Sequence, residues 1–268
     1  PAAAHYLDNV DPSSGKTYSS VPDSDATDVD GAVQAAESAL TKWSATPAEK
    51  RAAVMFKIAD LLERDLERFA NAECVDNGKP LALARSLDIP RAVQNIRFFA
   101  AAVLHLHSES HSMGNLAINY TLRQPRGVVG IISPWNLPLY LFTWKIAPAL
   151  ATGNAVIAKP AEQTPLVAFR AIELLLEAGV PADVLHFLPG DGEEIGAYAV
   201  ALPSVAGVAF TGSNVTARNI NQTLAARHGA IAVLIAETGG QNALFADSSS
   251  LPEQVVLDVV HSAFNSAG

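Results

Sequence analysis

The chain has 268 residues, of which 49% are hydrophobic and 17% are charged. This composition is typical of a globular protein with a core large enough for one large or two modest domains. The net charge of −9 argues against a general nucleic-acid or anionic-membrane binder. No apolar run is long enough to span a membrane and no signal-peptide pattern opens the sequence, so we expect a cytoplasmic protein. The single cysteine, Cys74, excludes an internal disulfide framework, and the seven histidines show no ligand spacing, so we expect no metal site.

Residues 1–126 are expected to form a helical layer with a few β segments. The sequence from Thr46 to Glu49 matches a capping box, with a proline in the first turn of the helix that follows. That helix would contain Cys74, which we therefore interpret as structural, and would end at Asn77-Gly78. The expected elements are two extended pieces around a turn at 11–16, helices from 27, from 47 to 76 and from 90 to 107, a polar segment at 108–117 and a strand at 118–122.

Residues 127–268 alternate between apolar runs and helical patterns, as the strands and crossover helices of a parallel sheet do. The strand runs are almost continuously apolar, which predicts burial on both faces. The fold class is therefore α/β: a doubly wound parallel sheet, Rossmann-like, with the N-terminal helical layer packed on it. The expected strands are 128–132, 154–158, 184–188, 206–210 and 231–236, and the expected helices are 138–151, 165–178, 193–200, 214–226 and 252–266, with caps at Thr164 and Ser250.

Candidate functional residues follow the ends of these strands, where ligands bind in parallel sheets. Asn136 lies between Pro134 and Pro138 after the first strand, and its amide could donate two hydrogen bonds to a developing oxyanion. Alternatively, Asn136 is an Asx-type turn residue that closes the strand-to-helix connection. Lys159 and Glu162 follow the second strand and could hold the two hydroxyls of a ribose. Alternatively, they form a solvated ion pair in a loop.

Glycine-rich turns follow the third and fourth strands. Pro189–Gly192 with Gly196, and Phe210–Ser213, place small residues where a strand leads into a helix N-terminus, a local structure that binds phosphate through free N–H groups. Neither turn matches the GxGxxG pattern of the common dinucleotide site.

Glu237 follows the fifth strand and precedes Thr238 and a diglycine. A carboxylate that emerges from a buried strand is expected to have a raised pKa because of desolvation, as a general base requires. Alternatively, it caps a neighbouring helix.

Five motifs together resemble the aldehyde dehydrogenase superfamily: SPWNLP, KPAEQTP, LPGDG, FTGS and ETGGQNA stand in that family's order over essentially the whole chain. The resemblance implies a NAD-binding variant of the Rossmann fold and parts of a bridging and oligomerisation region. It also implies oxidation of an aldehyde, a semialdehyde in particular, to a carboxylic acid through a thioester on a catalytic cysteine. The expected cofactor is NAD rather than NADP, because Glu162 repels a ribose 2′-phosphate. The expected assembly is a homodimer or homotetramer.

The family's functional residues match positions of this chain one by one. Asn136 matches the oxyanion-hole asparagine, Glu237 the general base, and Lys159 and Glu162 the adenosine-ribose ligands. Ala217 stands where the family often has glycine. The other implied cofactor-binding residues are Ile132, Ser133, Pro134, Trp135, Gly192, Gly196, Phe210, Thr211, Gly212, Ser213, Thr238 and Gly239, and the implied substrate-tunnel residues are Leu137, Leu141 and Trp144.

The resemblance changes along the chain. Up to about residue 210 it is to the muconic-semialdehyde dehydrogenases, and after that to the glutamate-semialdehyde dehydrogenases of proline catabolism. In the family a catalytic cysteine follows the helix that here ends in SAFNSAG, so we expect the chain to be an N-terminal part without the catalytic domain and inactive alone. Three alternatives stay open: a non-catalytic NAD-binding fragment, an NADP-preferring enzyme, and a general sugar- or nucleotide-binding α/β protein.

Overall fold

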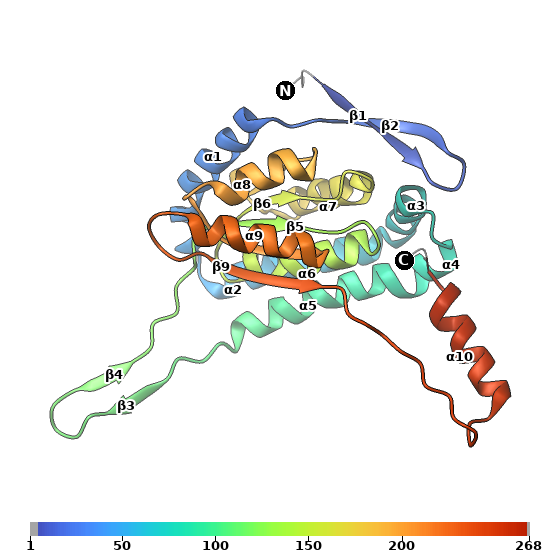
Figure 1. Ribbon diagram of the computed structural model, residues 1–268. Coiled ribbons are helices and arrows are strands. Elements are labelled where there is room, and N and C mark those ends of the chain that lie inside the picture. The colour runs from blue at the N-terminus through green and yellow to red at the C-terminus, as the bar shows by residue number, and fades with distance from the viewer. Residues whose placement is uncertain (1–4, 267–268) are drawn as a thin grey trace.

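The computed structural model, which describes residues 5–266, contains a five-stranded parallel sheet in the order β7-β6-β5-β8-β9. The strand order reverses direction on either side of β5, which is the arrangement of a doubly wound sheet. The α/β fold class predicted from the sequence is therefore confirmed (Figure 1). The strands are β5 (Val128–Ile132), β6 (Ala155–Lys159), β7 (Leu185–Phe187), β8 (Val205–Gly212) and β9 (Val233–Thr238).

Helices cover both faces of this sheet. Alternate residues of a strand point to opposite faces, and in β6 Val156 packs in one hydrophobic cluster while Ile157 packs in the other. The first cluster joins the sheet to α2 (Ala48–Arg64), α3 (Leu66–Asn77), α5 (Ile89–Leu104), α6 (Pro138–Ala151) and α7 (Pro165–Ala178). The second joins it to α1 (Ala26–Ser44), the π-helical turn η3 (Gly192–Gly196), α8 (Ala197–Ala201) and α9 (Asn214–Ala226).

The long helix expected at 47–76 is wrong, because the chain breaks at Asp65 into α2 and α3. Asp65 has φ −98° and ψ 19°, outside the helical region, and its carboxylate pairs with Arg64. The predicted capping box is also absent: Pro47 is the N-cap of α2, and the Thr46 hydroxyl donates to the Lys42 carbonyl oxygen at 3.0 Å instead. A short helix, α4 (Leu81–Leu83), and a π-helical turn, η1 (Ala84–Asp88), lead into α5.

Thr164 does precede α7, but its side chain makes no capping hydrogen bond. The Asp76 carboxylate at the end of α3 accepts from the free N–H groups of Leu166 (3.2 Å) and Val167 (2.7 Å) instead. The predicted cap at Ser250 is likewise replaced, because Leu251 is the N-cap residue of α10 (Pro252–Phe264) and makes no side-chain bond.

Two β-hairpins lie outside the central sheet. The turn expected at 11–16 joins β1 (Tyr6–Asp11) to β2 (Lys16–Pro22). The segment expected to be merely polar at 108–117 contains β3 (Ser110–Ser112), which pairs with β4 (Ile118–Tyr120). The β3–β4 hairpin extends away from the body of the molecule (Figure 1), and its apolar side chains Leu116 and Ile118 are exposed.

The expected burial of the fifth strand is wrong. β9 is an edge strand that pairs with β8, and its last four residues are exposed. Beyond β9 an extended segment leads to α10, in which no residue is buried (Figure 1). Within residues 5–266, no helix has the length and apolar character needed to cross a membrane.

Candidate functional site

A cleft of about 730 Å³ opens at the carboxyl ends of β5, β6 and β8. Its volume is in the range of small-molecule and cofactor pockets. The structure brings the expected cofactor-binding residues together here, apart from Thr238 and Gly239. Those that line the cleft are Ile132, Ser133, Pro134, Trp135, Lys159, Glu162, Gly192, Gly196, Phe210, Thr211, Gly212 and Ser213.

Lys159 and Glu162 form an ion pair on the wall of this cleft, with 2.5 Å between Nζ and Oε2. The Lys159 side chain is 8% exposed and that of Glu162 is 35% exposed, so the pair is not the fully solvated one of the alternative interpretation. Burial raises the pKa of Glu162, but the hydrogen bond and the charge of Lys159 outweigh it and hold the pKa below its usual value. The carboxylate is therefore ionised at neutral pH and can accept hydrogen bonds from hydroxyl groups.

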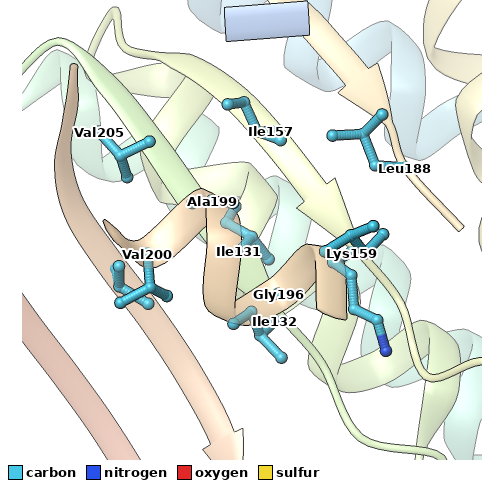
Figure 2. Close-up of a pocket in the computed structure, with 12 residues that line it drawn as sticks. Ile131, Ile132, Ile157, Lys159, Leu188, Gly196, Ala199, Val200 and Val205 are labelled. Atoms are coloured by element: carbon cyan, nitrogen blue, oxygen red, sulfur yellow. The ribbon is translucent and has the colours of Figure 1, made fainter. Parts of the chain in front are cut away.

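The inner wall beside Lys159 is apolar. In Figure 2 the side chains of Ile131, Ile157, Leu188 and Val200 surround a small cavity between the sheet and the η3–α8 segment, and the nitrogen of Lys159 points away from them. This cavity of about 20 Å³ has space for about one water molecule, which is too little for a cofactor. The apolar side chains around this cavity pack behind the wall of the larger cleft.

Three of the predicted glycines line the cleft, and Gly212 is the one whose surroundings leave no space for a side chain. A Cβ at Gly192 would lie 3.1 Å from Lys159 Nζ, and a Cβ at Gly212 would lie 2.5 Å from the Phe210 ring. At Gly196 the nearest atom to a Cβ would be 4.0 Å away, so the space there does not demand glycine.

The two helix N-termini at the cleft differ in charge. At η3 the Asp191 carboxylate already accepts from the Glu193 N–H (2.7 Å), and Glu193 and Glu194 occupy the first turn. At α9 the Ser213 hydroxyl accepts from the Thr216 N–H (3.0 Å), and the first turn contains no acidic residue. An anion such as a pyrophosphate therefore fits the N-terminus of α9 better than that of η3.

Asn136 lies in the loop between β5 and α6. Within residues 5–266 its side-chain amide has no hydrogen-bond partner, so the Asx turn of the alternative interpretation is not formed and both amide donors stay free. Its backbone carbonyl oxygen accepts from Asn77 Nδ2 (3.1 Å) and from Lys79 Nζ (3.3 Å), which both come from the end of α3.

The three expected tunnel residues do not share one cavity. Trp144 lines a second cavity, of about 350 Å³, together with residues of β5, β8 and β9, and its ring meets Phe99 with centroids 5.4 Å apart. Leu137 caps the start of α6 and Leu141 lies in its first turn, and both are half-buried.

Lys145 and Glu237 also line this second cavity, and the sequence did not predict that they would lie together. Burial lowers the pKa of Lys145 to about 8, with the Glu237 charge opposing the shift. The sequence did contain one indication of this site, because Lys145 is a charged residue within the mostly apolar sequence of α6.

Glu237, Thr238 and Gly239 lie at the exposed end of β9. Thr238 pairs with Gly212 across the sheet, so this strand end is next to the cleft but does not line it. The burial expected around Glu237 is absent among residues 5–266, where its side chain is exposed.

Cys74, the sole cysteine of the sequence, is half-buried in α3. Burial, and then the neighbouring Glu73 carboxylate, raise the pKa of its thiol, which makes it a poor nucleophile at neutral pH. Within the described residues, no group of three or more histidine, cysteine, aspartate or glutamate side chains could hold a metal ion.

Known proteins resemble this chain in both sequence and fold. The chain is 47% identical over 264 residues to the 2-aminomuconic semialdehyde dehydrogenase of Homo sapiens, covering 98% of this chain and 54% of that protein. It is 44% identical over 242 residues to the bifunctional protein PutA of Escherichia coli (strain K12), covering 88% of this chain and 17% of that protein. The crystal structure of PnpE in complex with nicotinamide adenine dinucleotide superposes with a TM-score of 0.91 at 34% identity, covering 97% of this chain and 53% of that one.

The chain spans about half the length of the aminomuconic relative. The aldehyde dehydrogenase family pattern matches residues 1–268. These likenesses agree with the five motifs and with the cleft at the strand ends. The chain therefore belongs to the aldehyde dehydrogenase family.

Proposed function

We propose that this chain supplies the cofactor half of an enzyme that oxidises an aldehyde, a semialdehyde in particular, to a carboxylic acid with NAD. The observation that carries the proposal is the single cleft that gathers Lys159, Glu162 and Ser213 at the carboxyl ends of adjacent parallel strands. The likeness to a semialdehyde dehydrogenase supports the substrate class.

NAD would lie along this cleft, where it would accept a hydride from the substrate carbon. Glu162 would accept hydrogen bonds from the ribose hydroxyls and Lys159 would donate to them. Ser213 and the N-terminus of α9 would hold the pyrophosphate. The Glu162 carboxylate would also repel a ribose 2′-phosphate, which supports NAD over NADP.

The substrate half would use Asn136 and Glu237. The free Asn136 amide would donate to the oxyanion that forms when a thiolate attacks the aldehyde. Glu237 would activate the water that hydrolyses the thioester. Leu137, Leu141 and Trp144 would line the approach of the aldehyde, and the thiol would come from outside the described residues.

A second candidate is a NAD-binding module without chemistry of its own. It is favoured by the position and the raised thiol pKa of Cys74, which leave the cleft without a nucleophile among residues 5–266. The two candidates share the cofactor site and differ in turnover.

Calorimetric titration with NAD+, together with an aldehyde turnover assay, tests both candidates. Glu162→Gln keeps the shape of the side chain and removes its charge, so we expect NAD+ to bind about 10- to 100-fold more weakly, as loss of about 1.5–3 kcal/mol from a charge-assisted hydrogen bond implies. The matched control is Glu37→Gln, an exposed carboxylate of α1, which should leave the affinity within about twofold. Equal affinity in both variants would contradict the assignment of the ribose site, and NAD+ binding without turnover would support the module.

We also propose that the full-length protein is a homo-oligomer. The β3–β4 hairpin supports this, because Leu116 is 91% exposed and Ile118 is 73% exposed on a hairpin that extends from the body. Exposed apolar side chains of this kind are typical of association surfaces.

A further inference from the structure

The end of α3 contacts the loop that carries Asn136 through a buried polar cluster, which consists of Glu73, Asn77, Lys79 and Asp88. Each of these side chains belongs to a residue that is at most 7% exposed. None of them lines the cofactor cleft, and the proposed chemistry does not use them.

Lys79 uses all three of its N–H donors within this cluster. Its Nζ donates to Glu73 Oε1 (3.0 Å), to Asp88 Oδ2 (2.9 Å) and to the carbonyl oxygen of Asn136 (3.3 Å). An ammonium group has three donors, so its position is fully determined. The two carboxylates fix the position of the ammonium group, and the ammonium group in turn holds the loop through the carbonyl oxygen of Asn136.

Asn77 holds the same loop one peptide earlier. Its Nδ2 donates to the carbonyl oxygens of Trp135 (2.8 Å) and Asn136 (3.1 Å). The opposite amide orientation would place Oδ1 against two carbonyl oxygens, so the orientation is unambiguous. Asn77 Oδ1 is buried without a hydrogen-bond partner in residues 5–266, and this costs folding free energy. The two hydrogen bonds that Nδ2 donates to the loop offset that cost.

The loop is also held at both of its ends. The Ser133 N–H donates to the Lys159 carbonyl oxygen (3.2 Å), and the Leu139 N–H donates to Glu73 Oε2 (3.3 Å). The stretch from Ser133 to Leu139 is therefore bonded to the end of β6 and to the end of α3.

Stability alone does not account for this cluster. A buried ion pair costs so much desolvation that replacing it with apolar side chains is often neutral or stabilising. Burial raises the pKa of Glu73 to about 7 even beside Lys79, which shows how strongly the site disfavours charge. What the cluster does achieve is geometric: it fixes both peptide planes that flank the Asn136 Cα.

We propose that Asn77 and Lys79 are positioning residues that aim the Asn136 amide. A peptide unit is planar, so holding the carbonyls of Trp135 and Asn136 sets φ and ψ of Asn136 and hence the direction of its Cα–Cβ bond. The side-chain amide of Asn136 makes no hydrogen bond within residues 5–266, so both of its donors stay free. The oxyanion role of Asn136 rests on the proposed function. The geometry of the loop rests on the hydrogen bonds alone.

Asn77→Asp tests the proposal, because it keeps the shape of the side chain and replaces two donors with an oxygen that repels both carbonyls. Asn95→Asp is the matched control. Asn95 is equally buried, and its Nδ2 donates to the Tyr140 carbonyl oxygen (3.2 Å) in the body of α6 rather than in the loop. The readout is the hydrogen–deuterium exchange rate of the Ser133 and Leu139 amides, with NAD+ affinity measured by calorimetry.

We expect Asn77→Asp to raise exchange at Ser133 and Leu139 at least tenfold and to weaken NAD+ binding about tenfold, since Trp135 lines the cleft. Asn95→Asp should leave both quantities within about twofold of wild type at a similar loss of thermal stability. Equal acceleration in both variants, or none in Asn77→Asp, would overturn the proposal. If Asn77→Asp does not fold, Asn77→Ser with Asn95→Ser gives the same comparison without a new charge. Failure of the wild-type chain to bind NAD+ would reject the proposed function, whereas the exchange rates decide the positioning role independently.

Discussion

The ends of β6 and β9 belong to the same sheet and point the same way, yet they differ in what surrounds them. At the end of β6, Lys159 is buried, paired with Glu162 and faced by the glycine turn at Gly192. At the end of β9, Glu237 and Gly239 are exposed. A second layer covers the end of β6 and completes the cofactor cleft there. β6 lies between two neighbours and under η3, and β9 is an edge strand with a single neighbour.

Glycine substitutions at the ends of the neighbouring strands β8 and β9 give the largest expected contrast, because the end of β8 lines the cleft and the end of β9 does not. In Gly212→Ala the new Cβ would lie 2.5 Å from the ring of Phe210, which is itself 3% exposed and cannot move freely. We expect a loss of about 1–3 kcal/mol in the free energy of unfolding, as overpacking typically costs.

Gly239→Ala is the matched change at the uncovered end, where no atom lies within 4 Å of the new Cβ. It should change the free energy of unfolding by less than about 0.5 kcal/mol. Urea denaturation of both variants measures the difference, and similar midpoints for the two would contradict the contrast.

The pH dependence of stability gives a smaller effect on the covered side. Burial raises the pKa of Glu73 to about 7, above its unfolded value of 4.5, so the folded state binds the proton more tightly than the unfolded state. The contribution of this group is fully present below about pH 4.5 and is lost as pH rises to about 7. We expect a decrease on the order of 1 kcal/mol across that interval, and Glu73→Gln should flatten it. An unchanged slope in Glu73→Gln would assign the trend to other groups.

The sequence predicted the core of the fold well because its patterns are local. The boundaries of β5, α6, α7 and α9 match the expected ranges, since apolar periodicity and first-turn prolines determine them within a few residues. The long helix failed at Asp65, where the break comes from packing and from the pair with Arg64 rather than from a glycine or proline.

Some residues of the candidate site could also be predicted from local sequence, and others could not. The residues that line the cleft follow strand ends, so chain order was enough to propose them. Asn77, Lys79 and Asp76 could not be found in this way, because they lie some 60 to 90 residues away from the backbone groups that they bond. Glu237 shows the opposite error: a local apolar run cannot reveal whether a strand lies at the centre or at the edge of its sheet.

We propose above all that the cleft at the ends of β5, β6 and β8 holds NAD. Hydrogen–deuterium exchange of the chain with and without NAD+ tests it most directly, because bound ligand slows exchange of the amides it covers. We expect slower exchange at 191–196 and 211–216, around η3 and the N-terminus of α9, and no change at 237–251, from the end of β9 onward. Unchanged exchange around α9 at saturating NAD+, or protection confined to 237–251, would contradict it.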